Sequence, residues 1–358
     1  MNITVMGSGN GGLAVAYHWA SKAHRVNLYA VPGHDDNIGA VAAAGGVRAH
    51  GDIEGFAPVA YSGTDVTRAM EDTETVFVVA PAFATADFAR LAAPYLRAGM
   101  VVAVCPGSCV GSLVFKEAAG LDVHDESVII GETNTLPYAS RADGQGAVHF
   151  FHSFSTGLSA AAAPRSGNAR LLEVIRLIYP YTAEAATVFQ TTLQNGNPVI
   201  HPAVTLLNTG LIERTGGDFN FYEDGVTESV GRLMAGVDRE RMAIADALGV
   251  QILSEPELGV AQGYMTEANY TTGYSAAPGF RGIKAPDRIA TRYLTEDLAY
   301  TMVFWTDLAA RLGVATPVMD ALIQIASVVL GRDLIAKAPR TLASVQLDGL
   351  STEQLLKL

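Results

Sequence analysis

His201 interrupts an apolar run of the sequence, VIHPAVTLLN from residue 199 to residue 208. A histidine in such a run is often a structural residue whose hydrogen bonds are satisfied. A histidine also has a pKa near neutrality, so it can give or take a proton when a carbonyl or an imine is reduced. A nearby carboxylate that orients the ring would favour this second, catalytic interpretation.

The segment RYLTED from residue 292 to residue 297 supplies such carboxylates and a cation. Thr295 can cap a helix that follows it, with Glu296 and Asp297 in the first turn, where carboxylates suit the helix dipole. Capping alone would explain one acid. Arg292 is either a solvated surface residue or a binding group, since a guanidinium can hold a carboxylate through two hydrogen bonds.

A glycine-rich stretch, GSGNGG, occupies residues 7 to 12 and matches the pattern G-x-G-x-x-G. It follows a predicted strand at 3–6 and opens a predicted helix at 12–22, which is the context of a dinucleotide-binding turn. The first glycine of the pattern permits the tight turn, the second admits a pyrophosphate and the third lets the helix pack closely. The predicted ligand is NAD or NADP, and the predicted contacts are Gly7, Ser8, Gly9, Asn10, Gly11 and Gly12.

The preference between NAD and NADP stays open in the sequence. An acid that binds the adenosine ribose is expected at the end of the second strand, about 20 residues beyond the glycines, but Ala30 stands there. Asp35 could bind the ribose from the following loop. Alternatively, this loop could admit a 2′-phosphate beside His34, Arg25 or Arg48.

Two further turns follow predicted strands, at residues 79–83 and 105–108. Both leave the carboxyl edge of the sheet, where open α/β folds bind ligands. Proline and small residues there would let a nicotinamide lie against the backbone, although ordinary loops have the same composition. We predict Pro81 and Pro106 as cofactor contacts.

The first half of the chain alternates short β-branched runs with amphipathic ones, which predicts a parallel sheet with helices on both faces. The segment 159–167, SAAAAPRSG, looks like a loop or the approach to a helix. The predicted strands are 3–6, 25–30, 75–80, 100–105 and 127–130.

Helical patterns replace the strands after about Tyr181. We therefore predict an α/β fold with an N-terminal Rossmann domain, residues 1–184, followed by an all-α domain, residues 185–358. The long helices expected in the second domain are 199–213, 226–247 and 298–312.

Composition limits the partners and the location. A net charge of −12 over 358 residues argues against nucleic acid or an anionic membrane as a partner. No apolar run approaches the roughly 18 residues of a spanning helix, and the amino terminus does not look like a signal peptide, so we expect a cytoplasmic protein. The two cysteines, Cys105 and Cys109, lack the spacing of redox or zinc sites, and no metal is predicted.

The combination of motifs resembles the octopine/opine dehydrogenase family. The matching stretches run in order across nearly the whole chain: GSGNGG from Gly7, VAPAFA from Val79, GETNTLPYASR from Gly131, NGNPVIHP from Asn195, PGFRGI from Pro278 and RYLTED from Arg292. Members of the family join an amino acid to a 2-keto acid, often pyruvate, and reduce the imine with NADH or NADPH. The resemblance implies a Rossmann domain, a helical domain and substrates in the cleft between them.

The same resemblance implies roles for individual residues. His201 would be the proton donor and acceptor, Asp297 would orient it, and Arg292 would bind a substrate carboxylate. The segment 215–222, TGGDFNFY, would shape the amino-acid pocket. Other residues in stretches that resemble site-lining segments are Glu132, assigned to the cofactor, and Thr133 and Asn208, assigned to the substrate.

Two alternatives compete with this interpretation. The first is a hydroxy-acid or ketopantoate-type reductase on a related scaffold. Such enzymes commonly use a lysine, yet the sequence has none near His201, and Lys284 is the only one close to Arg292. The second is a non-catalytic dinucleotide-binding sensor, which would not need His201, Arg292 and Asp297 together. A homodimer through the helical domain is possible.

Overall fold

A computed structural model describes residues 1–358 and divides the chain into two compact units. The first unit comprises Met1–Thr191 with Lys357–Leu358, and the second comprises Thr192–Leu356. Helix α7, Val188–Leu193, crosses the point where the chain passes from one to the other. The first unit contains all the strands and the second is helical.

The main sheet of the first unit has eight strands. Six of them are parallel, in the doubly wound order that dinucleotide-binding folds use, and β11 is antiparallel to its neighbour β8. The strands across the sheet are β12 (Ala183–Glu184), β11 (Ser159–Ala163), β8 (Ile129–Thr133), β7 (Val101–Val104), β6 (Thr75–Val78), β1 (Asn2–Met6), β2 (Arg25–Tyr29) and β5 (Tyr61–Gly63).

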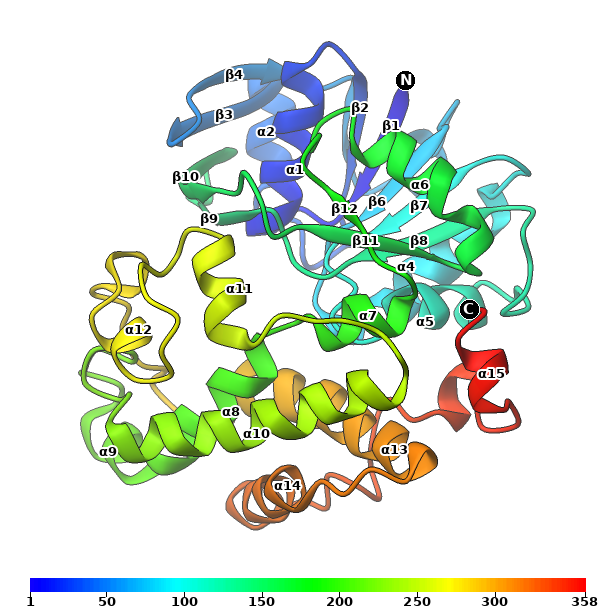
Figure 1. Ribbon diagram of the computed structural model, residues 1–358. Coiled ribbons are helices and arrows are strands. Elements are labelled where there is room, and N and C mark those ends of the chain that lie inside the picture. Colours follow the sequence, from blue (N-terminus) through cyan, green and yellow to red (C-terminus); the bar gives the residue numbers. More distant parts are fainter. The chain divides into compact units, whose positions relative to one another are not determined.

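Both faces of this sheet are buried, because strand side chains alternate between them. Ile3 and Val5 enter one core with residues of α1 and α6. Met6 enters the opposite core with Phe88 of α4 and Phe115 of α5. Figure 1 shows these helices flanking the strands. The helices of this unit are α1 (Asn10–Ser21), α2 (Ile38–Ala44), α3 (Val66–Ala69), α4 (Thr85–Ala92), α5 (Gly111–Ala118) and α6 (Asn168–Ile175).

A smaller four-stranded sheet, which the sequence analysis missed, packs against α1 through Tyr17 and Phe150, whose rings lie 5.9 Å apart. Two of its strands, Gly46–Gly51 and Gly55–Pro58, are partly exposed and contain glycine, so no β-branched run marks them in the sequence. In order across the sheet, the strands are β4 (Gly55–Pro58), β3 (Gly46–Gly51), β10 (Ala147–Ser153) and β9 (Tyr138–Ala142).

The prediction of a loop or the approach to a helix over 159–167 is wrong for its first five residues, whereas the last residues do lead into α6. Residues Ser159–Ala163 form strand β11, followed by a short 3-10 turn. Alanine has little intrinsic preference for strands, but here small side chains fit a fully buried position and pairing with β8 overrides propensity. The Asn168 side chain also accepts a hydrogen bond from the Ala162 N–H at 2.7 Å. The strand expected at 127–130 begins slightly later, as β8.

Glycine is required at two positions of the turn between β1 and α1. Gly7 has φ +122°, and a Cβ there would lie 2.1 Å from the Val79 carbonyl oxygen. A Cβ on Gly12 would lie 1.9 Å from the carbonyl oxygen of Gly7. A Cβ on Gly9, in contrast, would have no atom within 4 Å. The fold itself therefore demands Gly7 and Gly12 but leaves open space beside Gly9.

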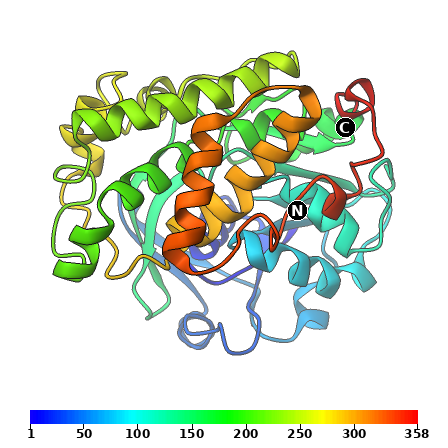
Figure 2. The ribbon, with the colours of Figure 1, turned by 90° about the horizontal axis from the view of Figure 1, so that it is seen from below.

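The second unit is built from helices packed around α8 and α10 (Figures 1 and 2). None of the helices in the structure has both the length and the apolar character that a membrane-spanning segment requires. The helices of this unit are α8 (Asn197–Leu207), α9 (Thr209–Thr215), α10 (Glu228–Ala247), α11 (Glu255–Ala261), α12 (Thr272–Ser275), a π-helix (Tyr293–Met302), α13 (Val303–Leu312), α14 (Pro317–Leu330) and α15 (Thr352–Leu355).

Two of the predicted helices differ from the observed ones. The chain expected as one helix over 199–213 is split at Asn208 into α8 and α9. Thr295 does not cap the helix expected at 298–312, because helical structure already begins at Tyr293 as a π-helix. The Thr295 hydroxyl instead donates to the Thr291 carbonyl oxygen at 2.9 Å. Local capping chemistry was therefore a wrong guide to where this helix starts.

We predict that Gly7→Ala destabilises the first unit by about 1–3 kcal/mol or more, since the added Cβ meets backbone at a positive φ. Gly39→Ala is the matched control, because Gly39 lies exposed in α2 with no atom within 4 Å of an added Cβ. The control should leave stability unchanged or raise it by up to about 1 kcal/mol. Urea unfolding measures both, and equal effects of the two changes would contradict the assignment.

Candidate active site

His201 and Asp297 form a buried pair in the second unit, although 96 residues separate them in the chain. The His201 Nδ1 lies 2.7 Å from the Asp297 Oδ2, and the two side chains are only 8% and 5% exposed. An ionised carboxylate can only accept a hydrogen bond, so Nδ1 carries the proton and donates it. This fixes the tautomer of the neutral ring and leaves Nε2 as the atom available for proton exchange.

The Tyr222 hydroxyl lies 3.2 Å from the His201 Nε2. Burial raises the pKa of Tyr222 well above its ordinary value, and the charges of Tyr293, Glu255 and Asp297 raise it further. Tyr222 therefore keeps its proton at neutral pH and can donate to Nε2 when the imidazole is neutral. Both ring nitrogens of the histidine are thus held by named partners.

Aromatic rings fix the plane of the imidazole. The Tyr293 ring stacks on His201 with centroids 4.0 Å apart and an interplanar angle of 23°. Phe221 packs against Tyr293 at 5.0 Å, and Phe280 stacks on Tyr222 at 4.3 Å. Tyr293 and Phe280 belong to the stretches RYLTED and PGFRGI, but the sequence does not mark them as neighbours of the histidine, because an aromatic residue by itself is an ambiguous signal.

Local backbone structure explains how one histidine meets both Tyr293 and Asp297. These residues lie about one turn apart on the π-helix, which packs against α8. A π-helix is wider than an α-helix and is frequently found at functional sites. In α8, Pro202 follows His201 directly and has no N–H to continue the helical ladder.

Arg292 precedes the π-helix and is solvent-exposed. It makes no hydrogen bond or ion pair within the chain. Desolvation lowers the pKa of Arg292, but the carboxylates of Asp297 and Glu296 outweigh it and the net direction is upward. The guanidinium therefore remains charged close to the His201–Asp297 pair, which suits it to hold an anionic group.

Other predicted residues have their side chains occupied within the chain. The Asn208 amide donates to the carbonyl oxygens of Val204 and Gly225, at 2.9 and 3.0 Å. Thr133 donates to the Thr135 carbonyl oxygen at 2.8 Å. The Asn208 side chain thus joins two segments of the helical unit, whereas Thr133 belongs to the unit that contains the sheets. Direct ligand contacts of both residues stay predictions.

Glu132 is completely buried in the first unit. Its Oε2 accepts hydrogen bonds from the Ser112 N–H at 2.9 Å and the Ser112 hydroxyl at 2.7 Å. Its Oε1 accepts from the Thr191 hydroxyl at 2.9 Å. A Cβ on Gly107 would lie 2.5 Å from this carboxyl group, so the turn after Pro106 packs directly on it. In the structure Glu132 supports that turn.

The glycine turn offers backbone groups rather than free side chains. The Ser8 hydroxyl donates to the His34 carbonyl oxygen at 3.2 Å, and the Asn10 Oδ1 accepts from the Ala142 N–H at 2.9 Å. Helix α1 starts without a side-chain cap, so its first N–H groups are available to an anion. Gly11 lies against the side chains of Leu136 and Val79.

The loop beyond β2 is folded on itself. Ala30 is buried at the end of the strand, and the Asp35 Oδ1 accepts a hydrogen bond from the Gly33 N–H at 3.1 Å. Pro81 lies at the start of the short 3-10 turn Ala82–Ala84. Nowhere in residues 1–358 do three or more His, Cys, Asp or Glu side chains gather in a way that could hold a metal ion.

A dinucleotide-type turn in one unit and a buried, carboxylate-bonded histidine in the other define the class, a two-domain NAD(P)-dependent dehydrogenase. Residues 184–330 match the family model described as NAD/NADP octopine/nopaline dehydrogenase, alpha-helical domain. The chain is 31% identical to the opine dehydrogenase of Arthrobacter sp. (strain 1C) over 97% of its own length and 95% of the relative's. The chain therefore belongs to the octopine/opine dehydrogenase family.

Solved structures agree with this family at the level of the fold. Octopine dehydrogenase with NADH and L-arginine matches with a TM-score of 0.78 at 19% identity, covering 100% of this chain and 98% of that one. Yersinopine dehydrogenase with NADP+ bound matches with a TM-score of 0.72 at 15% identity, covering 99% and 97%. The predicted α/β class, with a Rossmann domain before a helical domain, is confirmed.

We predict that Tyr222→Phe lowers the free energy of unfolding by about 0.5–1.5 kcal/mol, because the buried Nε2 of His201 loses its hydrogen bond. Tyr274→Phe is the matched control, since the Tyr274 hydroxyl is buried in the same unit without a hydrogen-bond partner. Removing that hydroxyl should leave stability unchanged or improve it. Chemical denaturation distinguishes the two, and an equal loss in both variants would show that the contact at Nε2 has no energetic weight.

Proposed function

We propose that this protein is an opine dehydrogenase that joins an amino acid to a 2-keto acid, such as pyruvate, and reduces the product imine with NADH or NADPH. The observation that supports it most is the buried His201–Asp297 pair in a chain of this family. The reverse oxidation uses the same groups. The relatives' ligands, NADH, L-arginine and NADP+, fit this proposal.

His201 handles the protons in the proposed reaction. The amine nitrogen bonds to the keto carbon as the carbon–oxygen double bond opens, and the imidazolium of His201 gives its Nε2 proton to the keto oxygen. The neutral ring then takes a proton from the nitrogen and returns it to the resulting hydroxyl group, which leaves as water when the carbon–nitrogen double bond forms. Asp297 stabilises the imidazolium through the 2.7 Å contact at Nδ1 and holds the ring in place. Such proton transfer contributes about 10²–10⁴ to a rate.

Arg292 binds the carboxylate of a substrate in this proposal. It is charged, exposed and unpaired within the chain, and it lies next in sequence to Tyr293, which stacks on the catalytic ring. A guanidinium can hold a carboxylate through two hydrogen bonds, which would orient the keto acid as well as bind it.

The glycine turn fits the dinucleotide. Open space lies beside Gly9, where an added Cβ would meet no atom within 4 Å, and the uncapped start of α1 offers N–H groups to a pyrophosphate. When bound, the dinucleotide supplies the hydride for the imine carbon. Cofactor contacts at Pro81, Pro106 and Glu132 stay predictions, as do domains at 1–184 and 185–358, a cytoplasmic location and a homodimer.

The direct test follows oxidation of NADH and of NADPH with pyruvate and other 2-keto acids, alone and with a panel of amino acids. We expect turnover only when both substrates are present. Turnover with the keto acid alone would favour the simple reductase. Binding of the dinucleotide without turnover under any condition would favour the sensor.

Replacing the proton-transfer residues should lower the turnover rate strongly while the cofactor still binds. We expect His201→Ala and Asp297→Asn to lower kcat by about 10²–10⁴, with little change in the Kd for NAD(P)H. His149→Ala, an exposed histidine of β10, is the control and should keep the wild-type rate. Full turnover in either variant would remove that residue from the mechanism.

Gly9→Ala separates binding of the cofactor from folding. Because the fold leaves space at Gly9, this variant should unfold at the same urea concentration as the wild type. The methyl group would occupy the approach of the pyrophosphate and weaken NAD(P)H binding by roughly tenfold or more, which fluorescence titration measures. Unchanged affinity would mean that the dinucleotide does not lie against this residue.

A further inference from the structure

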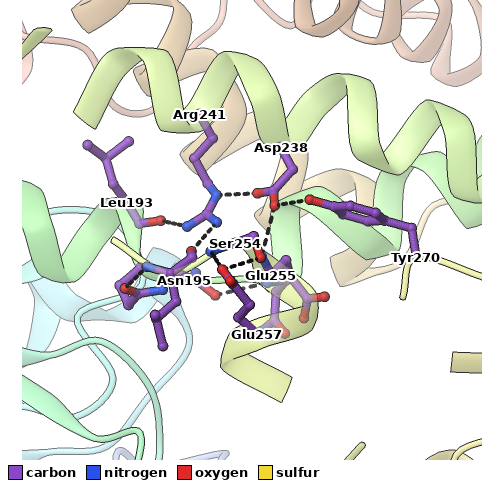
Figure 3. Close-up of polar contacts among 11 residues, drawn as sticks. Leu193, Asn195, Asp238, Arg241, Ser254, Glu255, Glu257 and Tyr270 are labelled. Atoms are coloured by element: carbon purple, nitrogen blue, oxygen red, sulfur yellow. Dashed lines mark hydrogen bonds and ion pairs between the residues drawn. The ribbon is translucent and has the colours of Figure 1, made fainter. Parts of the chain in front are cut away.

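A cluster of buried charges lies in the helical unit around Arg241 and Asp238 of α10 (Figure 3). Both side chains are completely buried, and the Arg241 Nε donates to the Asp238 Oδ1 at 2.6 Å. Arg241 also donates to the carbonyl oxygens of Leu193 and Leu253. The Tyr270 hydroxyl donates to the Asp238 Oδ2 at 2.6 Å. These two charges therefore satisfy each other inside the chain.

Glu255, the first residue of α11, lies beside this pair without sharing in it. Its backbone N–H donates to the Asp238 Oδ2 at 2.8 Å, but its side chain forms no ion pair with Arg241. Glu255 is 5% exposed, and its Oε2 is buried with no hydrogen-bond partner. A buried carboxyl oxygen without a hydrogen bond is unfavourable, so Oε2 is available to a partner from outside the chain.

The position of Glu255 connects it with the candidate active site. A Cβ on Gly196 would lie 2.7 Å from the Glu255 Cγ and 2.8 Å from its Oε1, so the carboxyl lies against the residue that precedes α8. Helix α8 carries His201. The charge of Glu255 also helps to raise the pKa of Tyr222, after burial and Tyr293. The charge of Glu255 therefore acts on a hydroxyl that lies 3.2 Å from the His201 Nε2.

We propose that Glu255 binds the ammonium group of the amino-acid substrate and takes one proton from it. The inference rests on the proposed function. In this step an N–H bond of the ammonium breaks, an O–H bond forms on Glu255, and the nitrogen keeps the electron pair with which it attacks the keto carbon. No oxidant or further reactant is needed. The step would generate the neutral amine, the only form of the amino group that is nucleophilic.

The surroundings of Glu255 suit a base for an ammonium ion. Burial raises the pKa of Glu255 well above its ordinary value, and the charge of Asp238 raises it further, while Arg241 opposes both. The other titratable groups around it are Tyr270, hydrogen-bonded to Asp238, and Tyr222. Glu255 is poorly solvated and lies near the negative charge of Asp238, so its carboxylate gains a favourable partner when a cation binds. For the same reasons it accepts a proton more readily than an exposed carboxylate does.

The test compares Glu255→Gln with Glu257→Gln in the full-length enzyme with NAD(P)H. Glu257 lies on the same helix but is exposed to solvent, and its carboxylate accepts a hydrogen bond from the Ser254 hydroxyl. Its variant therefore serves as the control. We expect Glu255→Gln to raise the KM for the amino acid by roughly tenfold to hundredfold, the effect of losing a charged hydrogen bond. The KM for the keto acid and the Kd for NAD(P)H should not change.

The pH profile separates this role from a structural one. Without the Glu255 carboxylate, kcat/KM for the amino acid should follow the concentration of free amine and rise about tenfold per pH unit up to the amine's own pKa. The wild type should reach its plateau at lower pH. If the wild type and Glu255→Gln had parallel pH profiles and the same KM for the amino acid, the proposal would be overturned. Absence of turnover in the wild type would instead overturn the proposed function.

Stability gives a readout that does not depend on turnover. The pKa of Glu255 is raised in the folded state, so this group stabilises the folded protein fully at a pH below its ordinary pKa of 4.5. This stabilisation is lost as the pH rises through the pKa that Glu255 has in the folded protein. At pH 8 without substrate, Glu255→Gln should therefore have a higher Tm than the wild type, and saturating amino acid should raise the Tm of the wild type more. A lower Tm for the variant at pH 8 would show that the carboxylate already has a partner, contrary to the proposal.

Discussion

The hydrogen bond between the His201 Nδ1 and the Asp297 Oδ2 is the constraint on which the rest of the candidate site depends. It joins α8 to the π-helix Tyr293–Met302 and buries both groups. Burial of a carboxylate without such a partner is strongly unfavourable. Once this contact fixes the register of the two elements, Tyr293 falls on the face of the imidazole and Tyr222 meets Nε2. Position and proton chemistry are therefore set by the same contact.

Three buried carboxylates of the helical unit show how environment assigns different roles to one chemical group. Asp238 is neutralised by Arg241 and acts as structure. Asp297 is paired with a histidine, which can exchange its second proton. Glu255 has no partner for its buried oxygen. A pair that satisfies itself stabilises the fold, whereas a group left unsatisfied is available to a ligand.

The residues of the candidate site were easier to predict than the structure that brings them together. The glycine turn stands out through its spacing and its place between a strand and a helix, whereas the roles predicted for His201 and Asp297 follow from the resemblance to the family. The parallel sheet follows from β-branched runs. The π-helix does not, since a widened helix has the same apolar pattern as an ordinary one, and Thr295 misleadingly resembles a cap. Strand β11 was missed because its four alanines are selected by a buried position, which only the tertiary structure creates.

The most direct test of this account is the protonation of the His201 ring, observed by nitrogen-15 NMR of the enzyme with labelled histidine. The neutral ring should carry its proton on Nδ1, with a downfield proton signal that marks the short hydrogen bond to Asp297 and disappears in Asp297→Asn. A proton on Nε2 and a bare Nδ1 would contradict the account, because Asp297 could then neither orient the ring nor stabilise its charged form.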